Sequence, residues 1–142
     1  MLYRLACVVI CLFLLANVSG CAEPLPEFGK VTGVITVKGA PKKGLAVTFM
    51  PEPSVGKELA INAASETDEQ GKYELRYSID GQQDVGAPVG KHRVLVYDPR
   101  FASIPQGEAA PPRWFSLDYS NPLKTPLRFE VHPGDQTFDI KL

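Results

Sequence analysis

The sequence predicts an all-β fold, a seven-stranded sandwich of two sheets, and three observations support this. The 13 prolines and 12 glycines fall mostly in short clusters, as turn residues do. No long stretch places apolar residues at the three- to four-residue spacing of a helix. Short rows of alternating apolar residues recur at intervals of about 8 to 12 residues, a spacing typical of sandwiches. A single sheet would leave one side of these rows in water.

The first strand is predicted over residues 31–37, where β-branched residues dominate. Residues 39–44 then supply the glycines, proline and lysines of an exposed turn. A second apolar row at period two follows, and Pro51 ends it because proline cannot donate to the sheet ladder. That row consists of Leu45, Val47 and Phe49.

Two further rows flank a tight turn predicted over residues 67–71. In this turn Asp68 can accept hydrogen bonds from the backbone ahead, and Gly71 can adopt a positive φ. The rows are Leu59, Ile61 and Ala63 before the turn, and Tyr73, Leu75 and Tyr77 after it. A polar, glycine-containing connection over residues 78–89 then leads to the clearest central strand, residues 91–97.

Residues 98–126 carry no strong strand signal and contain six prolines. A loop of this length within a compact domain is usually functional. After it, two apolar rows around a turn at residues 132–135 predict a C-terminal hairpin. The rows are Leu127, Phe129 and Val131, then Phe138, Ile140 and Leu142. The side chains expected to face the shared core are Tyr73, Leu75, Val94, Val96, Phe129 and Phe138.

Residues 1–20 have the features of an export signal. Arg4 precedes an apolar run over residues 5–16, which is shorter than the roughly 20 residues of a membrane-spanning helix. The segment ends in Val18-Ser19-Gly20-Cys21 and so resembles a bacterial lipoprotein signal with its lipobox. The resemblance implies that the Cys21 thiol receives a diacylglyceryl group and that cleavage leaves Cys21 as the first residue. An ordinary secretory signal ending near Ala16 or Gly20 is the alternative.

Cleavage after Gly20 leaves 142 − 20 = 122 residues, enough for one domain. We expect a lipid-anchored tether over residues 21–30 and a single domain over residues 31–142. The net charge of −1 changes little, and charges of both signs alternate along the chain, which argues against nucleic-acid binding. With Cys7 and Cys11 in the signal and Cys21 acylated, no cysteine remains for a disulfide or a thiolate metal site.

Residues 71–75 and 88–96 resemble the paired signatures of carboxypeptidase regulatory-like domains, and residues 31–39 resemble the first hairpin of that family. Residues 119–142 further resemble small bacterial envelope lipoproteins built on this domain. The resemblance implies a transthyretin-like sandwich over nearly the whole mature chain. It implies no chemistry, because the shared residues are turn and core positions. His92 departs from the pattern, which more often has Tyr, and we expect its imidazole to be buried and hydrogen-bonded.

The sequence shows no assembled catalytic site. His92 and Arg93 are neighbours on a predicted strand, so their side chains point to opposite faces. His132 is expected to be exposed in a turn, and two histidines so far apart do not indicate zinc. No serine lies in a nucleophile elbow. We therefore expect a non-enzyme without catalytic residues, metal or other cofactor.

Two charged turns leave alternatives open. Asp68 and its neighbours supply too few oxygen ligands for a calcium loop of the EF-hand kind, so the β-turn is the preferred interpretation. Lys42 and Lys43 are expected at a solvated turn tip, with contact to anionic lipid headgroups as the alternative.

The long loop holds the candidate binding surface, which consists of Trp114, Phe115 and Tyr119. Exposed aromatic rings stack on sugars or anchor protein partners. The alternative, which we prefer, is that Trp114 caps an open end of the sandwich, with its indole N–H bonded to a carbonyl.

These observations predict a lipid-anchored protein of the bacterial cell envelope, held on a membrane through acylated Cys21. The outer membrane is mildly preferred, because Ala22 and not aspartate follows the cysteine. The expected role is structural or adhesive, through contact with an envelope protein or a glycan. The alternatives are a carbohydrate-binding module that uses the loop aromatics and an accessory subunit of an envelope enzyme or transport complex.

Overall fold

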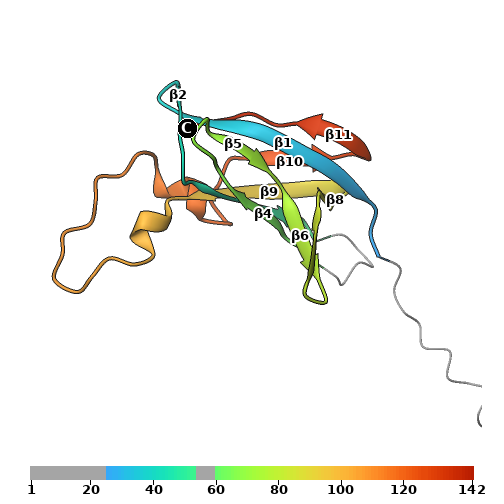
Figure 1. The fold of residues 1–142 in the computed structure, drawn as a ribbon, viewed down its shortest axis with the longest axis horizontal. Helices are drawn as coiled ribbons and strands as arrows, with labels where there is room; N and C mark the ends of the chain where they lie inside the picture. Colours follow the sequence, from blue (N-terminus) through green and yellow to red (C-terminus); the bar gives the residue numbers. More distant parts are fainter. Residues whose placement is uncertain (1–24, 54–59) are drawn as a thin grey trace, which may run out of the picture.

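The computed structural model describes residues 25–53 and 60–142. Cys21, the predicted signal and Leu59 lie outside the described residues. The described chain forms two packed β-sheets (Figure 1), which confirms the all-β, two-sheet class. The strands are β1 (Phe28–Val37), β2 (Ala40–Pro41), β3 (Ala46–Pro51), β4 (Ala63–Glu66), β5 (Lys72–Glu74), β6 (Arg76–Ile79), β7 (Gln82–Val85), β8 (Ala87–Pro88), β9 (Gly90–Tyr97), β10 (Arg128–Val131), β11 (Gly134–Thr137) and β12 (Ile140–Lys141). Two 3₁₀ turns, η2 (Pro99–Phe101) and η3 (Leu117–Ser120), lie in the long loop.

The first sheet is built around β1. Strands β11 and β12 run parallel to β1 on one side, and β2, β5 and β8 pair with it antiparallel on the other. The second sheet has the order β10-β9-β3-β4-β6-β7, with every neighbouring pair antiparallel. The apolar rows of both sheets therefore have a shared interior to fill.

Phe49 on β3 occupies the centre of this interior and is fully buried. Four rings surround it at centroid distances of 5.9 to 6.4 Å, and they belong to Tyr73, His92, Phe129 and Phe138. The predicted core positions Tyr73, Leu75, Val94 and Val96 are buried, as expected. Phe129 and Phe138 are half-buried and pack against the core.

The chain changes sheets within predicted strands, so the described residues hold twelve short strand segments where seven strands were expected. The predicted row from Tyr73 to Tyr77 divides at Leu75, because β5 pairs with β1 while β6 pairs with β4. At this corner the Leu75 N–H donates to the Val31 carbonyl at 2.9 Å, and the Leu75 carbonyl accepts from the Gly86 N–H at 2.8 Å. Corners of this kind join the two sheets of a sandwich.

Residues 78–89, interpreted from sequence as a connection, include most of a hairpin. Strands β6 and β7 pair around Asp80 and Gly81, whose φ angles are 50° and 80°. A two-residue hairpin turn of type I′ requires positive φ at both positions, which Asp-Gly tolerates. The Asp80-Gly81 dipeptide is the feature of the sequence from which this hairpin could have been predicted.

The predicted C-terminal hairpin is wrong. Strand β10 pairs with β9 in the second sheet, whereas β11 pairs with β1 in the first. The chain crosses between the sheets at His132 and Pro133, and the Gln136 side chain takes the place of a partner strand there. Its amide nitrogen donates to the His132 carbonyl at 2.5 Å, and its amide oxygen accepts from the His132 N–H at 3.1 Å.

The start of β1 also differs from the expectation. The strand begins at Phe28, three residues earlier, inside the stretch expected to be a tether. The Phe28 ring stacks on Tyr77 with 3.9 Å between centroids, and Phe28 pairs with Pro88. Aromatic packing and a strand partner therefore order this segment.

Candidate functional site

The turn over residues 67–71 is the β-turn predicted from sequence. Asp68 Oδ1 accepts hydrogen bonds from the N–H groups of Gln70 at 2.9 Å and Lys72 at 2.8 Å, and Gly71 has a φ of 72°. A Cβ at Gly71 would also lie 2.7 Å from the Ile35 carbonyl oxygen. The carboxylate oxygen thus holds the turn together, as the preferred interpretation requires.

The long loop, residues 98–126, projects from the end of the sandwich where β9 stops (Figure 1). Phe28, where β1 begins, lies at the opposite end. The loop leaves the second sheet at Asp98 and returns to it at β10. Its two 3₁₀ turns give it local structure that the search for alternating rows could not detect.

Asp98 fixes the first turn of this loop. Its carboxylate is buried and accepts from Arg100 Nε at 3.0 and 2.9 Å and from the Arg100 backbone N–H at 3.1 Å. Burial alone would raise the pKa of Asp98, but the hydrogen bonds and charge of Arg100, with the charge of Lys42, outweigh burial and lower the pKa. Asp98 is therefore ionised at neutral pH and orients the Arg100 guanidinium.

Trp114 lies against the same cations. Lys42 Nζ and Arg100 Cζ are each 3.5 Å from the indole centroid, which is the geometry of a cation–π contact. The solvated-tip prediction is therefore wrong for Lys42, whose side chain is half-buried against the indole. Lys43 is exposed and pairs with Glu69 at 2.8 Å. Trp114 thus connects the long loop to the turn over residues 39–44 through its contact with Lys42.

The structure brings the three predicted aromatic residues to one place. Trp114 and Phe115 are half-buried and pack against the core, and Tyr119 meets the Phe115 ring edge-on with 6.1 Å between centroids. Trp114 thus covers an end of the sandwich, as the capping hypothesis requires. The expected N–H to carbonyl bond is not among the hydrogen bonds of the described residues, and Lys42 and Arg100 contact the faces of the indole.

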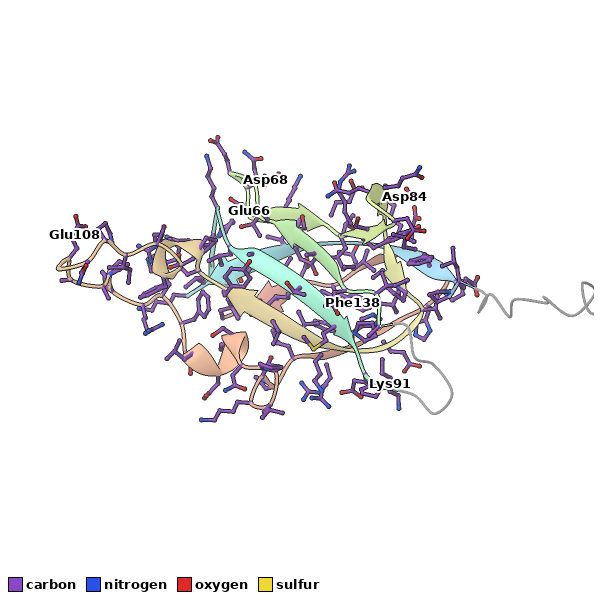
Figure 2. All side chains as sticks on the ribbon, turned by 90° about the horizontal axis from the view of Figure 1, so that it is seen from below. Glu66, Asp68, Asp84, Lys91, Glu108 and Phe138 are labelled. Atoms are coloured by element: carbon purple, nitrogen blue, oxygen red, sulfur yellow. The ribbon has the colours of Figure 1, made fainter. Side chains whose placement is uncertain are left out.

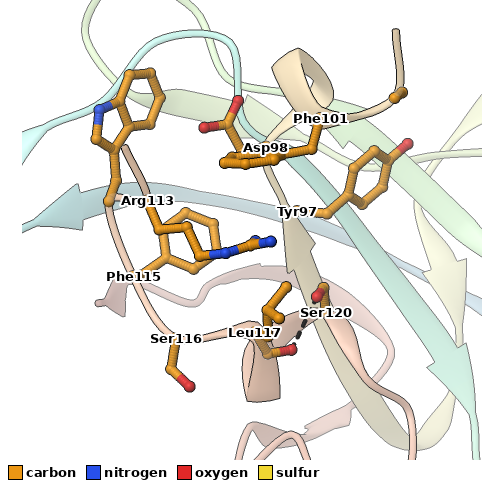
Figure 3. Close-up of a pocket in the computed structure, with 10 residues that line it drawn as sticks. Tyr97, Asp98, Phe101, Arg113, Phe115, Ser116, Leu117 and Ser120 are labelled. Atoms are coloured by element: carbon orange, nitrogen blue, oxygen red, sulfur yellow. Dashed lines mark hydrogen bonds between the residues drawn. The ribbon is translucent and has the colours of Figure 1, made fainter. Parts of the chain in front are cut away.

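A pocket of about 250 Å³ opens beside Trp114. Arg113 points into it between Phe101 and Leu117, and its guanidinium carbon is 4.3 Å from the Phe101 centroid (Figure 3). Tyr97 and Leu117 at the pocket are 45% and 54% exposed and present apolar surface to solvent. The lining residues are Tyr97, Asp98, Phe101, Ala102, Arg113, Trp114, Phe115, Ser116, Leu117 and Ser120.

The hydroxyl groups of both serines of the pocket form hydrogen bonds to the backbone of η3. Ser116 Oγ accepts from the Asp118 N–H at 3.2 Å. Ser120 Oγ donates to the Leu117 carbonyl at 2.8 Å, the bond drawn in Figure 3. These bonds order η3 and so present Leu117. Sequence reasoning found Trp114 and Phe115 here but missed Tyr97, Phe101, Arg113 and Leu117, because no local pattern indicates which loop residues converge.

A wider and more polar hollow lies between β1, β4 and β5, with a volume of about 560 Å³. Glu66 and Asp68 lie along its side of the molecule (Figure 2). Glu74 there pairs with Lys30 at 3.0 Å, and both side chains are substantially exposed. Glu74 also lies 3.9 Å from Arg76, whereas Glu66, Asp68 and Lys72 take part in none of the ion pairs found among the described residues.

The histidines lie where the sequence places them. His92 is buried, with Nδ1 2.9 Å from the Gly90 carbonyl oxygen, and His132 is exposed. Arg93 turns to the other face and lies 3.5 Å from Glu52. Among the described residues, no three His, Cys, Asp or Glu side chains are grouped to hold a metal ion.

The geometry thus defines a β-sandwich with an aromatic pocket at one end. No family model matches the chain, and no curated protein matches it. Over residues 25–53 and 60–142, no helix is long and apolar enough to cross a bilayer.

Proposed function

We propose that this chain is a lipid-anchored envelope protein whose β-sandwich serves a structural or adhesive role through contact with another protein. Acylated Cys21 is the anchor in this proposal, and the pocket end is the contact surface. The resemblance to carboxypeptidase regulatory-like domains adds support, because the residues that carry it are turn and core positions and not catalytic groups.

The observation that carries the proposal is that the N-terminal end of β1 and the pocket lie at opposite ends of the sandwich. Strand β1 runs from Phe28 at one end to Val37 near the long loop, a length of about 30 Å at ~3.3 Å per residue. Between Cys21 and Phe28 the backbone can extend at most about 25 Å at ~3.5 Å per residue. An anchor at Cys21 therefore keeps the Phe28 end within about 25 Å of the membrane, with the pocket end about 30 Å away along β1. In this proposal the pocket end faces outward.

The pocket end has the composition of a protein contact. Tyr97 and Leu117 expose apolar surface beside charged Arg113, and aromatic residues and arginine are enriched in protein interfaces. Sugar stacking on the indole needs a free ring face, and two cations already lie on that ring. A protein partner is thus favoured over the glycan alternative.

A matched pair of leucine variants tests this proposal. Leu117 borders the pocket and is 54% exposed, whereas Leu123 is 82% exposed and does not line it. The test uses the unlipidated Cys21→Ser protein, so that retention does not come from the anchor. In that protein we expect Leu117→Asp to abolish binding to partner-containing envelope material, and Leu123→Asp to leave binding unchanged. Equal retention of both variants would contradict a contact role for the pocket end.

A further inference from the structure

One charge at the pocket is left for a ligand. Arg113 and Asp98 are the charged residues that line it, and the Asp98 carboxylate is already bound by Arg100. None of the ion pairs found among the described residues involves Arg113. An anion is thus the complementary partner.

Arg113 is oriented to receive that anion. Its guanidinium carbon lies over the Phe101 ring, so the ring covers one face of the group and leaves N–H groups at its edge available. Figure 3 shows the side chain reaching into the pocket and not away from it. A carboxylate bound there can accept two N–H bonds in the bidentate geometry that arginine favours.

The other side chains that line the pocket are mostly apolar, so they favour a ligand that also carries an apolar group. Phe101, Phe115 and Leu117 line the pocket, and the serine hydroxyls serve η3. At about 250 Å³ the pocket is smaller than the roughly 300–1,000 Å³ of typical small-molecule sites, so it has room for about one amino-acid residue. The carboxylate and the apolar group must therefore belong to one residue.

We propose that this pocket binds the C-terminal residue of a partner polypeptide, with an apolar side chain between Phe115 and Leu117 and the terminal carboxylate on Arg113. This inference rests on the proposed function and names what the contact surface recognises. A C-terminal residue is the unit of a protein that carries an apolar side chain and a backbone carboxylate together.

The test uses the full chain in mild detergent, with N-acetyl-leucine as the probe and N-acetyl-leucinamide as its uncharged match. Trp114 is the chain's single tryptophan and lines the pocket, so its fluorescence reports binding directly. We expect saturable binding of the acid and an affinity at least about tenfold lower for the amide, because a charge-assisted hydrogen bond is lost.

Variants assign this difference to Arg113. Arg113→Gln should bind acid and amide alike, while Arg113→Lys should keep part of the preference. Arg76→Gln, an exposed arginine on β6, should behave as the unaltered protein. The comparison of acid with amide on the unaltered protein needs no variant, so a variant that fails to fold does not remove the test.

Three outcomes would overturn the inference: no saturable signal with N-acetyl-leucine, equal affinity for acid and amide, or tighter binding of glucuronic acid. The last would identify an acidic sugar as the occupant. Each outcome can occur while Leu117→Asp still abolishes envelope retention, in which case the contact role stands and the C-terminal recognition falls.

Discussion

Phe129 and Phe138 stack with 4.7 Å between ring centroids and 16° between ring planes, although Phe129 is on β10 of the second sheet and Phe138 lies between β11 and β12 of the first. Phe129 lies on β10 opposite His92, while the Phe138 N–H bonds to the Thr32 carbonyl of β1 at 2.8 Å. A Cβ at Gly33 would lie 2.0 Å from the Phe138 carbonyl oxygen. Glycine at position 33 therefore permits the close backbone approach that brings Phe138 to the ring pair.

This contact joins the sheets, so Phe129→Ala should lower the free energy of unfolding by about 3 kcal/mol, near the low end for a Phe→Ala change because the ring is half-buried. Denaturant titration measures the change. Glu130→Ala, at the exposed neighbour on β10, should stay within about 0.5 kcal/mol. Equal effects at both positions would refute the inter-sheet role of Phe129.

His92 should make stability depend on pH. Its Nδ1 donates to the Gly90 carbonyl, and its buried Nε2 has no hydrogen-bond partner among the described residues. Burial lowers the pKa of His92 below 6.5, against the opposing effects of Gly90 and of the Glu52 charge. Because the unfolded chain binds the proton more readily, stability is full above pH 6.5 and falls as the pH drops from 6.5 to the folded-state pKa.

The slope in that window is at most about 1.4 kcal/mol per pH unit. Urea titrations of the protein from pH 7.5 downward should show it, and His92→Phe should remove it. His132→Gln should leave it in place, because that histidine is exposed. A slope that persists in the His92 variant would assign the titration to another group.

Trp114→Ala should destabilise the fold by about 2 kcal/mol, below the full range for a buried tryptophan because the ring is half-buried. The loss combines core contacts with the two cation contacts at 3.5 Å. Lys42→Met keeps an unbranched apolar side chain and removes the charge, so it should lose only about 0.5–1 kcal/mol. Thermal melts of both variants are the measurement, and an unchanged melt for Trp114→Ala would mean that the indole does not stabilise the fold.

Cys21→Ser should leave an unlipidated protein, because a serine hydroxyl offers no thiolate for thioether formation. Mass spectrometry of the unaltered protein should find residue 21 at the mature N-terminus with an acyl mass, and the variant should lack that mass. Fractionation should then find the variant no longer retained at the membrane. A mature chain that begins elsewhere would contradict the lipid anchor, and with it the outward orientation of the pocket.

Much of the secondary structure was predictable because it depends on local patterns. Alternation at period two places Leu45 and Val47 on the buried face of their segment, and Asp68 with Gly71 defines its turn within five residues. The candidate site was predictable only in part. Trp114 and Phe115 were found because aromatic residues among prolines are conspicuous. Nothing in the sequence indicates that the Arg113 side chain points into a pocket.

The sequence by itself determined most of the extended segments, the turn at Asp68 and Gly71, and the apolar interior between sheets, because these follow from side-chain alternation and local backbone preference. Only the tertiary structure decided that Leu75 and His132 are corners, that Phe138 meets Phe129 across the interior, and that Lys42, Arg100 and Trp114 converge. These outcomes depend on which distant strands pair, and period two is the same for a strand in either sheet. The pocket beside Arg113 exists because of those pairings.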